Sequence, residues 1–295
     1  MQFSGCYTAL ITPFRDGRLD VPALRALIER QIAGGVDGIV PCGTTGESPT
    51  LDTAEHLEVI RLTIEFAAGR CQVVAGTGSN STAEAIELTS AAAALGATGS
   101  LQVCPYYNKP SQDGLYLHFK AIAEATALPL MLYSVPGRAG IEIAPHTVAR
   151  LAAACPNITA IKEAGGSVDR VSQLLQEVPE DFAILCGDDP LTLPFIACGA
   201  TGLVSVASNL IPDVIARLVR ACLNGSFDEA LVIHRQYYPL LRGLMSLDVN
   251  PVPIKSAVAL QGHCSAELRL PLAPLSPGNT TDLAKLLESY NLLSC

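Results

Sequence analysis

The sequence has no long hydrophobic run. Hydrophobic residues make up 49% of its 295 residues, enough for a large core, yet no apolar stretch approaches the roughly 18 residues that a membrane-spanning helix needs. The opening residues, MQFS, have neither the basic nor the apolar region of a signal peptide. We therefore expect a cytoplasmic protein, long for one ordinary domain but within the range of a single α/β barrel.

Positive charge is also scarce. The chain has 19 lysines and arginines against 28 aspartates and glutamates, a formal net charge of −9. Nucleic-acid binding requires a basic face that contacts phosphates, so this composition argues against a nucleic-acid partner. A small anionic substrate remains compatible with it if one or two basic residues supply positive charge locally.

Spacings typical of metal or disulfide sites are missing. The ten cysteines are scattered, none closer to the next than twelve residues, and no C-x-x-C pair occurs. The five histidines show no H-x-x-x-H spacing, and His56 and His118 fall in segments that are predicted to be helical. We expect buried thiols in a reducing compartment and chemistry without a metal.

What the sequence does contain is a regular alternation of short apolar strands and amphipathic helices. The strands recur at roughly 25 to 30 residues, a rhythm typical of a parallel sheet built from βα units. Eight units in one chain favour a closed (β/α)8 TIM barrel of the α/β class over an open sheet. The predicted strands are residues 7–14, 37–43, 71–78, 99–107, 128–135, 158–164, 182–189 and 201–208.

Capping residues mark the helices between these strands. Asp20 precedes a segment with apolar residues on one face. Asp52 and Glu55 form a capping-box pattern, and Ser81 and Glu84 form a second one.

The βα rhythm stops after about residue 224. Three further segments, residues 227–245, 253–261 and 281–290, are predicted to be helices, and no low-complexity linker precedes them. We therefore expect a barrel with the active site over residues 1–224 and a C-terminal helical extension, packed on the barrel, over residues 225–295.

The segment ITAIKEAGG, residues 158–166, places Lys162 at the end of a predicted buried strand. A lysine costs several kcal/mol to desolvate as a cation, so chains seldom put one there without a use. Strand alternation predicts that Lys162 shares a face with Ala160 and Ile158, opposite Glu163. This segment alone leaves two interpretations equal: an amine that forms a Schiff base with a ketone, or a rim lysine paired with a carboxylate.

Other polar residues follow neighbouring strands, where barrel active sites form. Tyr133 favours the catalytic interpretation because Schiff-base formation needs a proton shuttle, although a lone tyrosine is commonly a packed ring bonded to backbone. The GTTG stretch at residues 43–46 offers hydroxyl and backbone donors to a carboxylate, or makes an ordinary turn. Arg138 either clamps a second carboxylate or is an exposed loop residue.

Five stretches, GTTGES, PYYNKPSQDGLYLHF, YSVPGRAG, IKEA and GDD, occur in this order. In combination they closely resemble the dihydrodipicolinate synthase (4-hydroxy-tetrahydrodipicolinate synthase) family of the pyruvate-dependent class I aldolases and N-acetylneuraminate lyases. The similarity runs from about Phe3 into the C-terminal helices. It implies a lyase that condenses pyruvate with L-aspartate-4-semialdehyde, the first committed step of lysine biosynthesis through diaminopimelate.

The resemblance also implies roles for single residues. Lys162 matches the lysine that forms the Schiff base with pyruvate, so no cofactor is expected, and Tyr133 matches the proton-relaying tyrosine. Thr44 completes the relay with Tyr107, which in the family reaches in from a neighbouring subunit; we therefore expect a homotetramer (dimer of dimers) or a homodimer. The substrate-binding positions are Thr45 for the pyruvate carboxylate, Arg138 for the semialdehyde carboxylate, and Gly187 and Val204 as backbone positions in the pocket wall.

The family further has an inhibitory L-lysine pocket at the dimer interface. The matching residues are Ser48, His56, Asn80, Glu84 and Tyr106, whereas Thr53 replaces a histidine found in some lysine-sensitive members. Glu84 has an alternative as a helix-capping residue and His56 as a solvated helix position.

Four positions depart from the usual family pattern. Ser134 stands where asparagine usually follows the tyrosine, Gly137 stands where serine is usual, and Ala139 and Gly165 stand where threonine is usual. The resemblance places these changes on the aldehyde side of the pocket more than on the pyruvate side.

Two other functions compete with this one. N-acetylneuraminate lyases and 2-keto-3-deoxy sugar-acid aldolases or dehydratases share the lysine, the tyrosine and the glycine-threonine loop, but Arg138 favours an aldehyde that bears a carboxylate. The other competitor is a non-catalytic barrel that binds a keto acid. The proton relay of Tyr133, Thr44 and Tyr107 argues against it, since a binder needs no relay.

Overall fold

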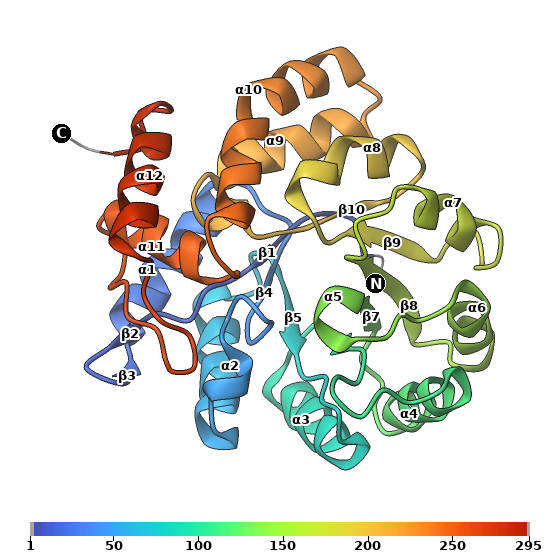
Figure 1. The fold of residues 1–295 in the computed structure, drawn as a ribbon. Helices are drawn as coiled ribbons and strands as arrows, with labels where there is room; N and C mark the ends of the chain where they lie inside the picture. The colour runs from blue at the N-terminus through green and yellow to red at the C-terminus, as the bar shows by residue number, and fades with distance from the viewer. Residues whose placement is uncertain (1–2, 294–295) are drawn as a thin grey trace.

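The computed structural model describes residues 3–293, and its centre is a closed barrel of eight parallel strands (Figure 1). The strands follow one another around the barrel in the order β1-β10-β9-β8-β7-β6-β5-β4, and β1 pairs with both β10 and β4. The strands are β1 Gly5–Ala9, β4 Gly38–Val40, β5 Gln72–Gly76, β6 Gly99–Val103, β7 Leu130–Ser134, β8 Ile158–Glu163, β9 Ala183–Cys186 and β10 Gly202–Ser205. Each predicted strand overlaps one of them, which confirms the (β/α)8 barrel.

The first strand is shorter than predicted. It ends at Ala9, and the remainder of the predicted segment enters a small antiparallel hairpin of β2 Phe14–Arg15 and β3 Arg18–Leu19. Asp16 and Gly17 connect them with φ angles of 53° and 76°, the positive values that a tight two-residue hairpin turn requires. The Asp-Gly pair was the available signal for this hairpin.

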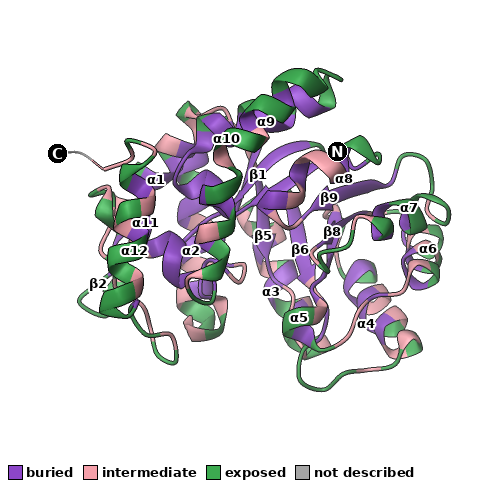
Figure 2. Cartoon of the chain, turned by 45° about the horizontal axis from the view of Figure 1, so that its top comes forward, coloured by how far each residue is buried: buried purple, intermediate pink, exposed green. Residues whose placement is uncertain are grey.

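Helices surround the barrel and bury one face against it (Figure 2). The helices of the barrel are α1 Val21–Ala33, α2 Thr53–Ala67, α3 Thr82–Leu95, α4 Gln112–Glu124, α5 Pro136–Ala139, α6 Pro145–Ala154, α7 Asp169–Leu175, α8 Thr192–Ala197 and α9 Pro212–Leu223, with short 3-10 turns η1 Ser48–Thr50, η2 Asp189–Leu191 and η3 Ala207–Asn209. Within residues 3–293, no helix has the length and apolar character needed to cross a membrane.

The chain continues into three further helices: α10 Phe227–Ser246, α11 Val252–Leu260 and α12 Pro277–Glu288. The predicted boundary near residue 224 falls in the turn between α9 and α10. Leu240, Ile254 and Leu283 are fully buried and join the same apolar cluster as residues of the barrel. The extension therefore shares a core with the barrel.

The capping boxes form only in part. The Asp52 carboxylate accepts the Glu55 N–H at 2.9 Å, and the Ser81 hydroxyl accepts the Glu84 N–H at 3.4 Å. The reciprocal contacts from the glutamates are replaced, because Glu55 pairs with Arg269 at 2.6 Å and Glu84 accepts from a nearby serine hydroxyl. The predicted helix starts are thus right, and the glutamate roles are different.

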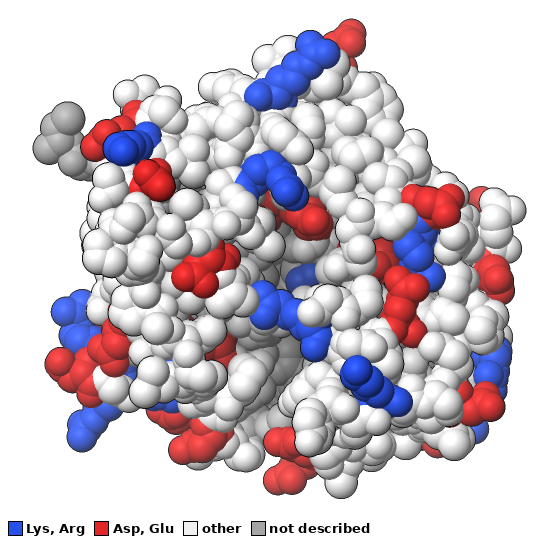
Figure 3. Space-filling model, viewed as in Figure 1, with Lys and Arg blue, Asp and Glu red and all other residues white. Residues whose placement is uncertain are grey.

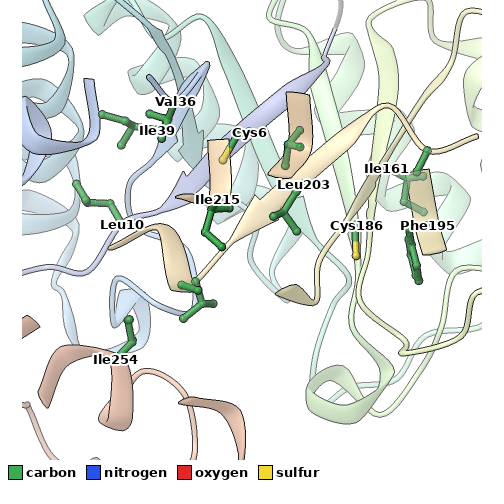
Figure 4. Packing of buried hydrophobic residues seen from close by; sticks show 14 of the residues in the cluster. Cys6, Leu10, Val36, Ile39, Ile161, Cys186, Phe195, Leu203, Ile215 and Ile254 are labelled. Carbon is green, nitrogen blue, oxygen red and sulfur yellow. The ribbon is translucent and has the colours of Figure 1, made fainter. Parts of the chain in front are cut away.

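Apolar side chains fill two layers. One lies inside the barrel, and the other lies between the strands and the helices, where Cys6 of β1, Leu203 of β10 and Ile215 of α9 gather (Figure 4). Of the nine cysteines in the described part of the chain, six are buried: Cys6, Cys42, Cys104, Cys155, Cys186 and Cys222. These thiols take the packing role predicted for them.

An irregularity in β8 decides which side chains face the barrel interior. Leu130 pairs with Ile158, but the next residue of β7 pairs with Ala160, so Thr159 is an extra residue, a β-bulge. Ala160 lies in the inner cluster, whereas Ile158 lies in the outer one. The prediction that Lys162 shares a face with Ala160 is confirmed, and the prediction for Ile158 is wrong because the bulge shifts the alternation.

Candidate active site

A pocket of about 400 Å³ opens at the carboxyl ends of the strands. Figure 3 shows it as a hollow at the centre of the molecule, with basic atoms at its edge and acidic atoms close by. Its wall combines residues from strand ends and from the extension: Ala9, Val40, Gly43, Thr44, Thr45, Leu101, Tyr133, Val135, Gly137, Arg138, Lys162, Ala164, Gly187, Asp188, Val206, Met245, Val249 and Asn250. A second hollow of about 230 Å³ adjoins it, sharing Thr44, Tyr133 and Arg138.

Lys162 lies on β8 inside this pocket and is 6% exposed. It pairs in register with Tyr133 of β7, and its ammonium nitrogen lies 4.3 Å from the centroid of the Tyr133 ring. Gly187 leaves room for it, since a Cβ at that position would lie 3.0 Å from Lys162 Cε. Lys162 itself forms no ion pair within the described residues, so the interpretation as a paired rim lysine loses its support.

Tyr133 is also 6% exposed and lies in the pocket wall. Among residues 3–293, its hydroxyl has no hydrogen bond to the backbone. The alternative interpretation, a packed ring whose hydroxyl bonds to backbone, does not describe this side chain. The hydroxyl is free to bond a ligand or a reacting group.

Thr44 and Thr45 reach the same pocket from the loop after β4, and Arg138 reaches it from the short helix after β7. Thr45 is 3% exposed, and its hydroxyl accepts a hydrogen bond from Asn250 Nδ2 at 3.0 Å. Arg138 lies on the short helix α5, is exposed, and donates to the Asn250 carbonyl at 3.0 Å. The sequence contains no signal for Asn250, because its partners Thr45 and Arg138 lie 205 and 112 residues away in the chain and only folding brings them together.

Two predicted site residues do not lie in this pocket. Tyr107 is 90% exposed, in a loop with φ of 71°. Val204 is fully buried in the barrel interior, and Val206 forms the pocket wall at that strand. The remaining members of the predicted catalytic and substrate-binding set come together.

The two aspartates after β9 differ in environment. Asp188 lies in the pocket wall, and burial raises the pKa of its carboxyl while Arg242 lowers it. Asp189 is buried behind the wall, where it accepts hydrogen bonds from the Ser205 hydroxyl and from the Val206 and Ala207 N–H groups. Asp189 therefore fixes the turn after β10, and Asp188 faces the pocket.

A separate hollow of about 190 Å³ lies beside α2 and α3. Its wall includes four of the residues matched to the inhibitory site, Ser48, His56, Glu84 and Tyr106, together with Thr53. His56 is not solvated as one alternative had it, because it is 7% exposed and its Nε2 lies 2.7 Å from the Gly76 carbonyl; burial lowers its pKa. Asn80, the fifth matched residue, is not part of this wall; it follows Ser79 of the wall and its Nδ2 donates to the Tyr106 backbone carbonyl at 3.1 Å.

Of the four departures from the family pattern, Gly137 lies in the pocket wall. Ala139 lies in the wall of the adjoining 230 Å³ hollow, whereas Ser134 is fully buried on β7. A Cβ at Gly165 would lie 2.7 Å from the Glu163 carboxylate, which accepts the Gly165 N–H at 2.7 Å. Any side chain at this position, including that of threonine, would crowd the Glu163 carboxylate, and glycine avoids this contact.

Comparison with known proteins identifies relatives over nearly the whole chain. The model of the Dihydrodipicolinate synthetase family matches residues 2–290. The 4-hydroxy-tetrahydrodipicolinate synthase of Pelobacter propionicus is 51% identical, covering 99% of this chain and 100% of its own. The structure of the 4-hydroxy-tetrahydrodipicolinate synthase of Methylacidiphilum fumariolicum superposes with a TM-score of 0.96 at 53% identity, covering 99% and 100%.

Another solved relative adds the strongest structural likeness among these. Dihydrodipicolinate synthase from Aquifex aeolicus superposes with a TM-score of 0.97 at 46% identity, covering 98% of this chain and 99% of its own. With a matching fold, a matching family model and half of its residues identical to named relatives, the chain belongs to the Dihydrodipicolinate synthetase family.

Proposed function

We propose that this lyase carries out the reaction of its family through a Schiff base on Lys162. The reaction condenses pyruvate with L-aspartate-4-semialdehyde to give 4-hydroxy-tetrahydrodipicolinate, an early step of lysine biosynthesis through diaminopimelate. The observation that carries the mechanism is the pocket in which Lys162 lies 4.3 Å from the Tyr133 ring, with nearly all of both side chains removed from water. Nothing in this arrangement favours a sugar-acid lyase or a non-catalytic binder.

The chemistry follows from a lysine and a proton shuttle. The neutral Lys162 amine adds to the pyruvate ketone, and the carbinolamine loses water to give an imine. Loss of a methyl proton gives an enamine, whose carbon forms the new bond to the aldehyde. The substrate's own amino group then attacks the imine carbon, closes the ring and releases Lys162. The imine is the electron sink, so this sequence requires no metal or other cofactor.

We assign the proton transfers to Tyr133, supported by Thr44 in the same pocket wall. A tyrosine hydroxyl delivers a proton to the departing carbinolamine oxygen and takes one back later. Tyr107 completes the relay only when supplied by a neighbouring subunit, because in its own chain it is 90% exposed. A homodimer or a homotetramer built as a dimer of dimers is therefore part of the proposal.

The second substrate bears a carboxylate and an ammonium group, and the pocket offers both complements. Arg138 stands at the mouth as a guanidinium suited to bidentate binding of the carboxylate. Asp188, a carboxylate in the wall of the same pocket, is the complement to the ammonium group. We assign Thr45 to binding of the pyruvate carboxylate, and the backbone at Gly187 to the deeper wall of the pocket.

L-lysine is a proposed inhibitor that binds the 190 Å³ hollow. A relative from Cyanidioschyzon merolae was solved with lysine bound, and Ser48, His56, Glu84 and Tyr106 surround the hollow here. The Glu84 carboxylate suits an ammonium group, and Asn80 contacts the site through its hydrogen bond to the Tyr106 backbone carbonyl. Activity titrated with millimolar L-lysine should fall, and Glu84→Gln should weaken the inhibition while sparing the uninhibited rate. Full activity in saturating lysine would contradict this assignment.

Trapping of the imine tests the Schiff base directly. The protein is incubated with pyruvate and borohydride, and peptide mass spectrometry locates the reduced adduct. A relative from Acinetobacter baumannii was solved in complex with pyruvate, and we expect the adduct on Lys162. Lys162→Arg should give no adduct and no condensation, whereas Lys109→Arg, a change at an exposed lysine near α5, should keep both. An adduct on another lysine would reject the assignment.

A cytoplasmic location completes the proposal, and fractionation of cells tests it.

A further inference from the structure

The loop that carries Thr44 and Thr45 ends on a residue with an unfavourable backbone conformation. Glu47 has φ of 56°, in the left-handed region, a backbone conformation that is unfavourable for residues other than glycine. Its N–H donates to the Thr44 carbonyl at 3.1 Å, so the position of Glu47 and that of the threonines are linked. A glycine would avoid the cost, so the glutamate side chain offsets it by another contact.

That contact is with the C-terminal extension. Lys255 of α11 donates to Glu47 Oε1 at 2.6 Å, and both side chains are 0% exposed. The Arg269 N–H donates to the other carboxylate oxygen at 3.1 Å. Burial lowers the pKa of Lys255 while the Glu47 carboxylate raises it, and the ammonium also lies 4.2 Å from the Phe14 ring centroid. Both carboxylate oxygens are thus held by residues more than two hundred positions away.

Asn250, in the segment between α10 and α11, makes a second contact with the same loop. Its side-chain Nδ2 donates to the Thr45 hydroxyl at 3.0 Å, and its backbone carbonyl accepts from Arg138 at 3.0 Å. One residue of the extension therefore touches both side chains that are proposed to bind substrate carboxylates. The extension meets the loop at its middle, through Thr45, and at its end, through Glu47.

A buried ion pair seldom stabilises a fold more than apolar side chains of the same size, because both ions lose their hydration. A buried ion pair does, however, fix the position and orientation of its two charged groups relative to each other. We propose that the Lys255–Glu47 ion pair and the Asn250–Thr45 hydrogen bond are positioning contacts, through which the extension sets the Thr44–Thr45 loop for pyruvate binding and proton transfer. This inference rests on the roles proposed above for Thr44 and Thr45.

The test replaces the ion pair by neutral side chains of similar size in the double variant Glu47→Gln/Lys255→Met. A single substitution would leave a buried charge unpaired and destabilise the fold strongly, whereas the double variant should melt close to the wild type. We expect the KM for pyruvate to rise, and borohydride trapping at limiting pyruvate to slow, by about tenfold or more. The KM for the semialdehyde should change less. Glu58→Gln, which weakens the Glu58–Arg61 ion pair on α2 and touches neither Glu47 nor Arg269, is the control and should keep wild-type kinetics.

A double variant with the wild-type KM and trapping rate would overturn the inference, and so would an equal loss for both substrates that follows the loss of folded protein by circular dichroism. If the double variant does not fold, Asn250→Leu replaces it, because this change removes only the donor to Thr45. A raised KM for pyruvate then supports the inference, and an unchanged one rejects it. Absence of an adduct in the wild type would instead contradict the proposed function, so the two failures are distinguishable.

Discussion

At the scale of the residue, Tyr133 separates binding from catalysis in this pocket. The phenol is buried beside Lys162, and within residues 3–293 its hydroxyl has no backbone partner. Tyr133→Phe keeps the ring and removes only the hydroxyl. We expect kcat to fall by about 10²–10⁴-fold, while pyruvate still binds and the adduct on Lys162 still forms slowly. Steady-state kinetics with both substrates measures the loss, and a wild-type kcat in the variant would exclude Tyr133 from the relay.

A second residue-scale effect concerns acid stability. His118 on α4 is buried, which lowers its pKa to about 4. The unfolded chain protonates this ring near pH 6.5, so the folded state binds fewer protons between these values and loses stability as pH falls through them. The loss approaches about 3 kcal/mol by pH 4, at about 1.4 kcal/mol for each pH unit.

His118→Phe removes the titrating group while keeping a ring against Phe119. We expect urea unfolding to show a smaller decrease in the free energy of unfolding between pH 7 and pH 4.5 than in the wild type. The comparison at pH 8, where the ring is neutral in both states, gives the packing change and the loss of the Thr82 hydrogen bond alone. Parallel pH profiles for the two proteins would show that His118 does not contribute.

At the scale of the element, the pocket depends on how closely the ends of β8 and β9 approach. Gly187 follows β9, and a Cβ there would lie 2.6 Å from Ala164 Cβ and 3.0 Å from Lys162 Cε. Gly187→Ala should therefore displace the amine and lower kcat/KM by about a hundredfold, with slower trapping. Gly278→Ala near the start of α12, where no atom lies closer than 3.9 Å, is the matched control. Equal kinetics for the two variants would mean that the strand ends adjust freely.

The same scale shows how far the sequence predicts this molecule. The eight strands and the mouth formed by Tyr133, Arg138 and Lys162 follow from local apolar runs and the polar residues after them, because parallel strands bring their ends together. The bulge at Thr159 does not follow, since a register shift depends on the partner strand. Asn250 and Lys255 were missed because their partners are distant in sequence and no local pattern marks a buried ion pair.

At the scale of the whole molecule, Tyr107 makes activity a property of the assembly in our proposal. Two inactive subunits should restore activity when mixed: Lys162→Arg supplies Tyr107, and Tyr107→Phe supplies Lys162. Random exchange in a dimer leaves half of the dimers mixed, each with one intact site, so about a quarter of the wild-type activity should return. Kinetics before and after dissociation and reassembly measure it. No recovery, despite mixed dimers by native mass spectrometry, would place Tyr107 outside the relay.

The distance in sequence between Glu47 and Lys255 bears on synthesis of the chain at the ribosome. The two are 208 residues apart. At about 5–20 residues per second, about 10–40 s pass between translation of Glu47 and translation of Lys255. Until α11 emerges, the Glu47 carboxylate must stay hydrated, because burial without its partner is costly. All eight strands are complete by residue 205. A nascent chain is therefore expected to close its barrel before it completes the pyruvate site, and ribosome-bound chains stalled before residue 255 should bind pyruvate more weakly than chains stalled after α11 has emerged.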